Sequence, residues 1–157
     1  MDATAEPAVR EAEVADAAAV GRLLHDFNTE YDEPTPDPSV IASRVRELLA
    51  TGEITVLLAG HGPAGLAVLR FRPALWGGGL ECYLQELYVV PDRRRQGFGR
   101  ALMEAAIDLA RRRGAGYIDL NTAETDVAAR ALYESLGFDN QGGRPDGPVN
   151  LYYEREL

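Results

Sequence analysis

The first third of the chain spaces its apolar side chains as two amphipathic helices would. In the first helix they recur at i, i+3, i+4 and i+7, after Asp16 as a candidate N-cap: Val20, Leu23, Leu24 and Phe27. Residues 31–38 contain three prolines, which cannot continue that helix. Asp37, with Pro38 at the first helical position, begins a second helix that Gly52 ends. Its apolar stripe consists of Ile41, Val45, Leu48 and Leu49.

Segments rich in β-branched, aromatic and aliphatic residues predict the strands of a sheet. Residues 9–11 can form a short strand. Residues 54–59 and 64–72 flank a Gly-His-Gly-Pro turn, which favours an antiparallel hairpin. Residues 81–90 predict a central strand, and residues 149–154 predict the last strand of the chain.

A strand, a helix and a second strand follow one another between residues 81 and 120. From residue 97 to 113, charges at every fourth position oppose apolar faces, which indicates an amphipathic helix. A right-handed crossover through this helix would make residues 117–120 parallel to the central strand. Thr125 or Asp126 can cap a fourth helix that ends near Gly137. The patterns together predict an α/β chain with a mixed sheet and flanking helices.

Length and composition fit a single soluble domain over residues 1–157, with 46% hydrophobic and 26% charged residues. No segment approaches the roughly 20 apolar residues of a membrane span. Residues 1–7 lack the basic start and the apolar run of a secretory signal. We therefore expect a cytoplasmic protein that does not bind membranes.

The charge of the chain limits the classes of molecule that it is expected to bind. Its net charge of −9 argues against nucleic-acid binding, which relies on cations that neutralise phosphates, and suits cationic small molecules. All 16 basic residues are arginine, which excludes lysine nucleophiles and the phosphate-loop lysine. With one cysteine, Cys82, and two histidines, His25 and His61, no metal site is expected. We expect Cys82 to be a small buried residue and His25 to be structural.

The segment Arg-Arg-Gln-Gly-Phe-Gly-Arg at 94–100 lies between a predicted strand and the start of a predicted helix. Unpaired amides and the helix dipole favour an anion there, and Gly97 and Gly99 let the backbone approach phosphate oxygens. A basic turn before a helix is the alternative. A dinucleotide fingerprint would require glycine where Leu102 stands.

The segment resembles the acetyl-CoA motif of the GNAT superfamily of N-acetyltransferases. That motif has arginine or glutamine, two residues, glycine, any residue, then glycine or alanine, and Arg94, Gly97 and Gly99 match it. Glu-Leu-Tyr-Val-Val-Pro at 86–91 resembles the preceding strand of the family, and Ala-Arg-Ala-Leu-Tyr at 129–133 resembles its following helix. The resemblance implies a central, mixed, mostly antiparallel sheet with one splayed parallel pair and flanking helices.

The resemblance also implies how acetyl-CoA, the co-substrate, would bind. The backbone around Leu87 and Val89 would hydrogen-bond the pantetheine arm between the splayed strands. The loop would hold the pyrophosphate through Arg94, Arg95, Gln96, Gly97, Gly99 and Arg100. Asp126 departs from the family, which often has asparagine there, and this puts a pantetheine contact from that side chain in doubt.

Two side chains are candidates for proton transfer. A primary alkylamine has a pKa near ~10.4, so the site must remove a proton before the amine can attack. Glu86, in an otherwise apolar strand, would gain a raised pKa from desolvation and act as the base, directly or through water. A glutamate that faces solvent or pairs with a neighbouring strand is the alternative, and Glu81 is a second candidate base. Tyr133 matches the tyrosine that this family places near the CoA sulfur to stabilise the leaving thiolate; a packed aromatic is the alternative.

We expect the acceptor to bind near the loop between the first two helices, because in this superfamily that loop often borders the acceptor pocket. Phe27 and Tyr31, followed by the acidic Asp32 and Glu33, suit an ammonium group, although a merely solvated acidic loop is the alternative. Trp76 can line the pocket, pack at an interface between copies or shield the sheet edge.

The sequence thus predicts an N-acetyltransferase that moves acetyl from acetyl-CoA to a primary amine, on a small molecule or a peptide N-terminus, by direct attack. Two alternatives stay open: a non-catalytic acyl-CoA-binding regulatory domain, and a nucleotide-binding module of the oxidoreductase type. No nucleic-acid partner is expected, and a homodimer is left open because it is common in the superfamily.

Overall fold

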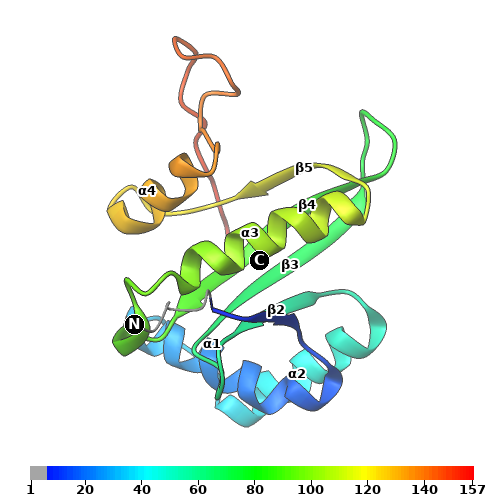
Figure 1. The fold of residues 1–157 in the computed structure, drawn as a ribbon, viewed down its shortest axis with the longest axis vertical. Helices are drawn as coiled ribbons and strands as arrows, with labels where there is room; N and C mark the ends of the chain where they lie inside the picture. Colours follow the sequence, from blue (N-terminus) through cyan, green and yellow to red (C-terminus); the bar gives the residue numbers. More distant parts are fainter. Residues whose placement is uncertain (1–6) are drawn as a thin grey trace, which may run out of the picture. The chain divides into compact units, whose positions relative to one another are not determined.

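The computed structural model describes residues 7–157 and divides into two compact units, one that ends at Leu120 and one that runs from Asn121 to Leu157 (Figure 1). The first holds the strands β1 (Val9–Glu11), β2 (Thr55–Ala59), β3 (Gly65–Pro73), β4 (Leu80–Val89) and β5 (Ala115–Leu120) and the helices α1 (Ala17–Glu30), α2 (Pro38–Thr51) and α3 (Phe98–Arg112). The second holds α4 (Val127–Ser135).

The prediction of one domain over the whole chain stays a prediction. Residues 1–6, on which the expectation of no secretory signal largely rests, lie outside the described residues. Within residues 7–157, no helix has the length and apolar character needed to cross a bilayer.

The sheet confirms the predicted topology. Its strand order is β1-β2-β3-β4-β5, with antiparallel neighbours except for β4 and β5, which are parallel as the crossover through α3 requires. The mixed, mostly antiparallel sheet with one parallel pair and flanking helices is therefore the observed fold. The parallel pairing is short, since it runs from Leu80 opposite Ala115 to Leu84 opposite Leu120.

Two hydrophobic layers cover the sheet of the first unit. On one face, α1 and α2 pack over alternate strand residues, including Val56, Leu66 and Val68. Their axes approach closely at Gly21, where an added Cβ would lie only 2.8 Å from the backbone nitrogen of Ala42. The other face packs against buried residues of α3: Phe98, Leu102, Met103, Ala106, Leu109 and Ala110. Figure 1 shows α1 and α2 side by side, apart from α3.

Two of the predicted caps form and one does not. Asp37 accepts from the backbone N–H of Ser39 at 3.0 Å, and Asp126 accepts from that of Ala129 at 3.4 Å. Asp16 is the N-cap residue of α1, as predicted, but its side chain makes no capping hydrogen bond to the helix. Its carboxylate instead binds Arg10 and the N–H of Glu13, because a 3-10 turn, Val14–Asp16, precedes α1.

The prediction of a last strand at residues 149–154 is also wrong, since the structure has no strand there. Leu151 and Tyr153 are 71% and 84% exposed. The aliphatic and aromatic residues of this segment favour a strand, but a strand also requires a hydrogen-bonded neighbour, and no strand of the described chain pairs with this segment.

Candidate active site

An irregularity in β4 brings two consecutive side chains to the same pocket. Val68 in β3 pairs with Glu86 in β4, but the next pair is Leu69 with Leu84, so Gln85 is an extra residue. Consecutive residues of a regular strand point to opposite faces, whereas a bulge re-aims one of them. Gln85 and Glu86 accordingly both line one cavity.

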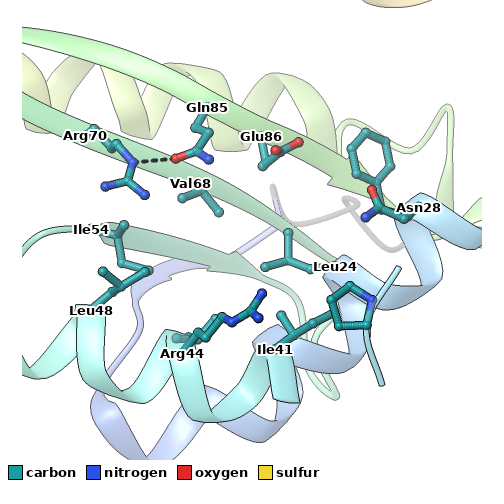
Figure 2. Close-up of a pocket in the computed structure, with 13 residues that line it drawn as sticks. Leu24, Asn28, Ile41, Arg44, Leu48, Ile54, Val68, Arg70, Gln85 and Glu86 are labelled. Carbon is teal, nitrogen blue, oxygen red and sulfur yellow. Dashed lines mark hydrogen bonds between the residues drawn. The ribbon is translucent and has the colours of Figure 1, made fainter. Parts of the chain in front are cut away.

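That cavity, of about 210 Å³, lies between the α1–α2 pair and strands β3 and β4 (Figure 2). Much of its wall is apolar, with Leu24, Phe27 and Ile41 among the lining residues. Its polar lining consists of Asn28, Arg44, Arg70, Gln85 and Glu86. A small molecule with one polar and one apolar part fits such a lining.

Glu86 is the single carboxylate among the residues that line this pocket. Its partner across the sheet is Val68, and burial raises the pKa of its carboxyl. Desolvation penalises the charged form, which makes the carboxylate a stronger base than an exposed glutamate. Glu81 differs, because it is held by Arg72 at 2.8 Å and does not line the pocket.

The edge of β4 beyond Leu84 has no parallel neighbour, because β5 ends at Leu120, opposite Leu84. On the other side, the N–H of Val90 donates to Ala64, and antiparallel residues alternate between bonded and non-bonded pairs. With the observed register, Tyr88 and Glu86 direct their backbone groups to β3. Leu87 and Val89 therefore direct theirs toward the open edge that β5 has left.

The loop before α3 has the backbone of an anion site. Arg95 and Gly97 have positive φ angles of 62° and 85°, and no described residue accepts a hydrogen bond from the N–H of Arg95, Gln96 or Gly97. The helical bond from Ala101 N–H to Gly97 is 3.0 Å long, and the amides of Phe98 and Gly99, which begin the helix, have no acceptor within it. Gly97 is the N-cap and contributes no side chain.

Side chains of the loop brace it from several directions. Gln96 donates to the carbonyl of Asp92 at 3.2 Å, and the Arg93 guanidinium lies 5.4 Å from the centre of the Phe98 ring. Arg95 and Arg100 are exposed. The loop is thus shaped by its own contacts while its amides stay available.

Arg94 contacts three residues on two elements of the first unit, α1 and β4. Its Nη2 donates to both carboxylate oxygens of Glu30, at 2.8 and 2.7 Å, and its Nε donates to the carbonyl of Val89 at 3.0 Å. The guanidinium also lies 5.7 Å from the centre of the Tyr88 ring. Its side chain connects the end of α1 to the end of β4, a contact between residues 64 positions apart that no local sequence pattern predicts.

The acceptor residues predicted from sequence are only partly brought together. Phe27 lines the pocket and packs against Tyr88, with ring centres 5.0 Å apart. Tyr31 stacks edge-on against Phe27 but is 54% exposed and does not line the pocket. Asp32 and Glu33 are exposed as well and do not line it.

Sequence reasoning missed the two pocket arginines, Arg44 and Arg70, and the amides Asn28 and Gln85. Arg70 and Gln85 interrupt strands that are otherwise apolar, and that interruption was a usable signal. The bulge that turns Gln85 into the pocket depends on strand register, which only the tertiary structure defines.

Tyr133 lies on α4, in the second unit. Burial and the nearby Asp126 raise the pKa of its phenol to about 12. The side chain packs against Phe138, with ring centres 6.1 Å apart. Its hydroxyl is therefore neutral at physiological pH and can donate a hydrogen bond.

None of the other residues singled out in the sequence, Cys82, His25 and Trp76, lines the pocket. Cys82 is buried, and burial raises the pKa of its thiol to about 11, which opposes a nucleophilic role. The Nδ1 of His25 lies 3.0 Å from the carbonyl of Pro36 and ties α1 to the following loop. Trp76 is 93% exposed, in the loop between β3 and β4. Residues 7–157 contain no cluster of three histidine, cysteine or acidic residues suited to a metal ion.

Comparison with known proteins identifies the family. The model of the acetyltransferase (GNAT) family matches residues 20–138. The chain is 28% identical over 137 residues to the uncharacterized N-acetyltransferase YhfO of Bacillus subtilis (strain 168), covering 86% of this chain and 91% of that protein. It is 48% identical over 59 residues to the ribosomal protein bS18-alanine N-acetyltransferase of Escherichia coli (strain K12), covering 38% of this chain and 40% of that enzyme.

Solved structures agree. The crystal structure of a protein assigned as an acetyltransferase, from Arthrobacter sp. FB24, is 46% identical, covers 100% of both chains and has a TM-score of 0.89. An aminoglycoside acetyltransferase from an uncultured soil metagenomic sample has a TM-score of 0.76 at 17% identity, covering 96% of this chain and 97% of its own, which is a likeness of fold alone. The chain belongs to the GNAT family of acetyltransferases, and it is an acyltransferase of that type.

Proposed function

We propose that the chain transfers an acetyl group from acetyl-CoA to a primary amine, on a small molecule or a peptide N-terminus, by direct attack of the amine on the thioester. One observation carries this proposal. A single segment of β4 presents an open backbone edge at Leu87 and Val89, and the adjacent Glu86 lines the pocket between α1, α2 and the sheet. One strand would thus hold acetyl-CoA, the acetyl donor, next to Glu86, the base.

The donor side follows from the backbone. The pantetheine arm carries amides, which can bond to the open N–H and C=O groups of Leu87 and to the N–H of Val89. The amides between Arg95 and Gly99 can bind the pyrophosphate, because they lie at the N-terminus of α3, where the positive end of the helix dipole favours an anion. The exposed guanidinium of Arg95 adds positive charge at the loop, as does that of Arg100, whereas Arg94 is engaged by Glu30.

The base is Glu86. Its raised pKa and its place in a mostly apolar pocket allow it to take a proton from the ammonium form of the acceptor, directly or through water. The neutral amine then forms the new C–N bond as the C–S bond breaks and CoA leaves as its thiolate, and the nitrogen gives up its second proton to that thiolate or to water.

Tyr133 would serve the leaving group. A phenol with a pKa of about 12 is about 3.5 units less acidic than a thiol of pKa ~8.5, so it does not protonate the thiolate fully. By the resemblance to the family, it would instead stabilise the thiolate as a hydrogen-bond donor. The cytoplasmic location, the absence of nucleic-acid and membrane partners and a homodimer stay predictions.

The test is release of free CoA thiol when acetyl-CoA is supplied with a panel of primary amines. We expect release, and we expect Glu86→Gln to slow it by about 10²- to 10⁴-fold with little change in acetyl-CoA affinity. Glu81→Gln is the matched control, since it removes a carboxylate of the same strand outside the pocket. Acetyl-CoA binding without release for any amine would favour the non-catalytic alternative.

A further inference from the structure

The pocket beside Glu86 contains two arginines for which amine acetylation alone has no use. Arg44 extends from α2 and Arg70 lies on β3, and both line the cavity with Glu86. In Figure 2, Arg70 lies beside Gln85 on the strands, and Arg44 approaches from the helix across from them. The pocket therefore has two cations and one carboxylate in a chain whose net charge is −9.

Both guanidinium groups keep donors for a ligand. Five arginines of the described chain are held in ion pairs, but within residues 7–157 neither Arg44 nor Arg70 has a carboxylate within 4.0 Å. Arg70 Nε donates to Gln85 at 2.5 Å, which orients the group and leaves its terminal N–H donors unused by the protein. A guanidinium presents five donors in a planar fork that matches a carboxylate.

We propose that the acceptor is an amino carboxylate, whose amine faces Glu86 and whose carboxylate is bound by Arg44 and Arg70. This inference rests on the proposed function and names the substrate class of the same site. The charges of the pocket complement a zwitterion at both ends, and the wall formed by Leu24, Ile41 and Leu48 accepts an apolar side chain between them. Charge-assisted bonds of this kind are about twice as strong as neutral ones.

The same charges disfavour polycationic acceptors. A second ammonium group would lie against Arg44 or Arg70, and like charges in a partly desolvated pocket repel. Asp32 and Glu33, which the sequence suggested as partners for an ammonium, do not line the cavity and cannot offset this. The inference thus separates this chain from an enzyme selective for aminoglycosides.

The experiment compares matched acceptors by CoA thiol release: leucine and phenylalanine, their carboxamides, and the alkylamines that lack the carboxyl group. We expect kcat/KM to be at least tenfold higher for the amino acids than for the carboxamides. The carboxamide amine has a pKa near ~8, like a peptide N-terminus, so amine basicity cannot produce that preference. A polyamine such as spermidine should be a poorer acceptor than leucine.

Variants assign the preference to residues. Arg44→Gln and Arg70→Gln should each raise the KM for the amino acid about tenfold or more, and should raise the KM for the carboxamide much less. Arg46→Gln is the matched control, because Arg46 is exposed on the same helix and does not line the pocket.

The outcomes are distinct. Equal use of amino acids and carboxamides, or an equal loss on both in the arginine variants, overturns the substrate class and leaves acetyl transfer standing. If none of the amines supports release of CoA thiol, the proposed function is overturned, and the inference falls with it. A carboxylate preference that the two arginine variants abolish supports it.

Discussion

Arg94 and Glu30 join the acetyl-CoA motif to the end of α1, since Arg94 Nη2 contacts both carboxylate oxygens at 2.8 and 2.7 Å. The two side chains are 39% and 27% exposed, and Tyr88 packs beside them and donates to Glu30 at 3.3 Å. The motif arginine therefore connects two elements that border the pocket, in addition to any role toward the phosphates.

We expect a measurable coupling between these residues. In a double-mutant cycle of Arg94→Gln and Glu30→Gln, the free energy of unfolding should show a coupling of about 1 kcal/mol, at the upper end for partly exposed pairs. The Arg112–Asp108 pair is the control, because both partners are more than half exposed at i, i+4 spacing and should couple by only about 0.3–0.5 kcal/mol. Equal couplings, measured by urea unfolding, would contradict the bracing role.

The pH dependence of the rate should report Glu86. Because burial raises its pKa, log kcat/KM should rise with pH through a midpoint above the usual glutamate value of about 4.3 and then level off. Glu86→Gln should remove that rise, while Glu81→Gln should keep it. A midpoint that persists in Glu86→Gln would assign the base elsewhere.

The same raised pKa has an opposite effect on stability. The folded state binds the Glu86 proton more tightly than the unfolded state, so stability falls as the pH rises from the unfolded pKa through the folded pKa. Glu86→Gln should therefore unfold at a higher urea concentration than the wild type at pH 7, and the difference should shrink below pH 4. A destabilised variant at pH 7 would show that the carboxylate is better stabilised than its burial implies.

Much of the fold followed from the sequence, because local patterns and short connections determine it. The helices at residues 38–51 and 98–112 have clear apolar stripes and end signals, and the parallel pairing of β4 and β5 followed from the crossover rule. The predicted last strand does not form, since aliphatic and aromatic content at residues 149–154 says nothing about whether a neighbouring strand is available to pair with it. Asp16 occupies the predicted N-cap position of α1, but its carboxylate binds Arg10, six residues away, in place of the amides of the helix.

The sequence predicted the motif positions of the candidate site but not the contacts that depend on tertiary structure. Motif positions such as Gly97 and Tyr133 can be found by spacing, since they depend on local backbone and on resemblance. The extra residue at Gln85, the ion pair of Arg94 with Glu30 and the presence of Arg44 and Arg70 in one pocket depend on elements far apart in the sequence. Register and packing decide these contacts, and neither is encoded in a local window.

Gly97 allows a test of the loop with a matched control. Gly97→Val should greatly weaken acetyl-CoA binding while the domain stays folded, because no protein atom lies within 4 Å of the added Cβ and the side chain would project toward the ligand. Its φ of 85° costs a non-glycine residue about 1–2 kcal/mol. Gly62→Val, with a φ of 78° and similar open space in a remote turn, should show the same strain and unchanged affinity by calorimetry. Equal affinities in the two variants would refute a ligand at the loop.

Tyr133 should affect the chemical step rather than binding. Tyr133→Phe should lower kcat by about 10²-fold, the scale of one lost donor to a developing anion, and leave the KM for acetyl-CoA nearly unchanged. Because its pKa is about 12, no loss of activity from its ionisation should occur below pH 10. Tyr152→Phe, an exposed position of the same unit, is the control. A normal kcat in Tyr133→Phe would leave only a packing role.

Amide hydrogen exchange with and without coenzyme A tests the central claim most directly, since it observes the open edge of β4 and the loop before α3 themselves. The N–H groups of Leu87, Val89 and Gly97 should exchange rapidly in the free protein and become protected on addition of coenzyme A, whereas the N–H of Tyr88, directed to β3, should be protected in both states. Unchanged exchange at Leu87, Val89 and Gly97 in saturating coenzyme A would contradict the account.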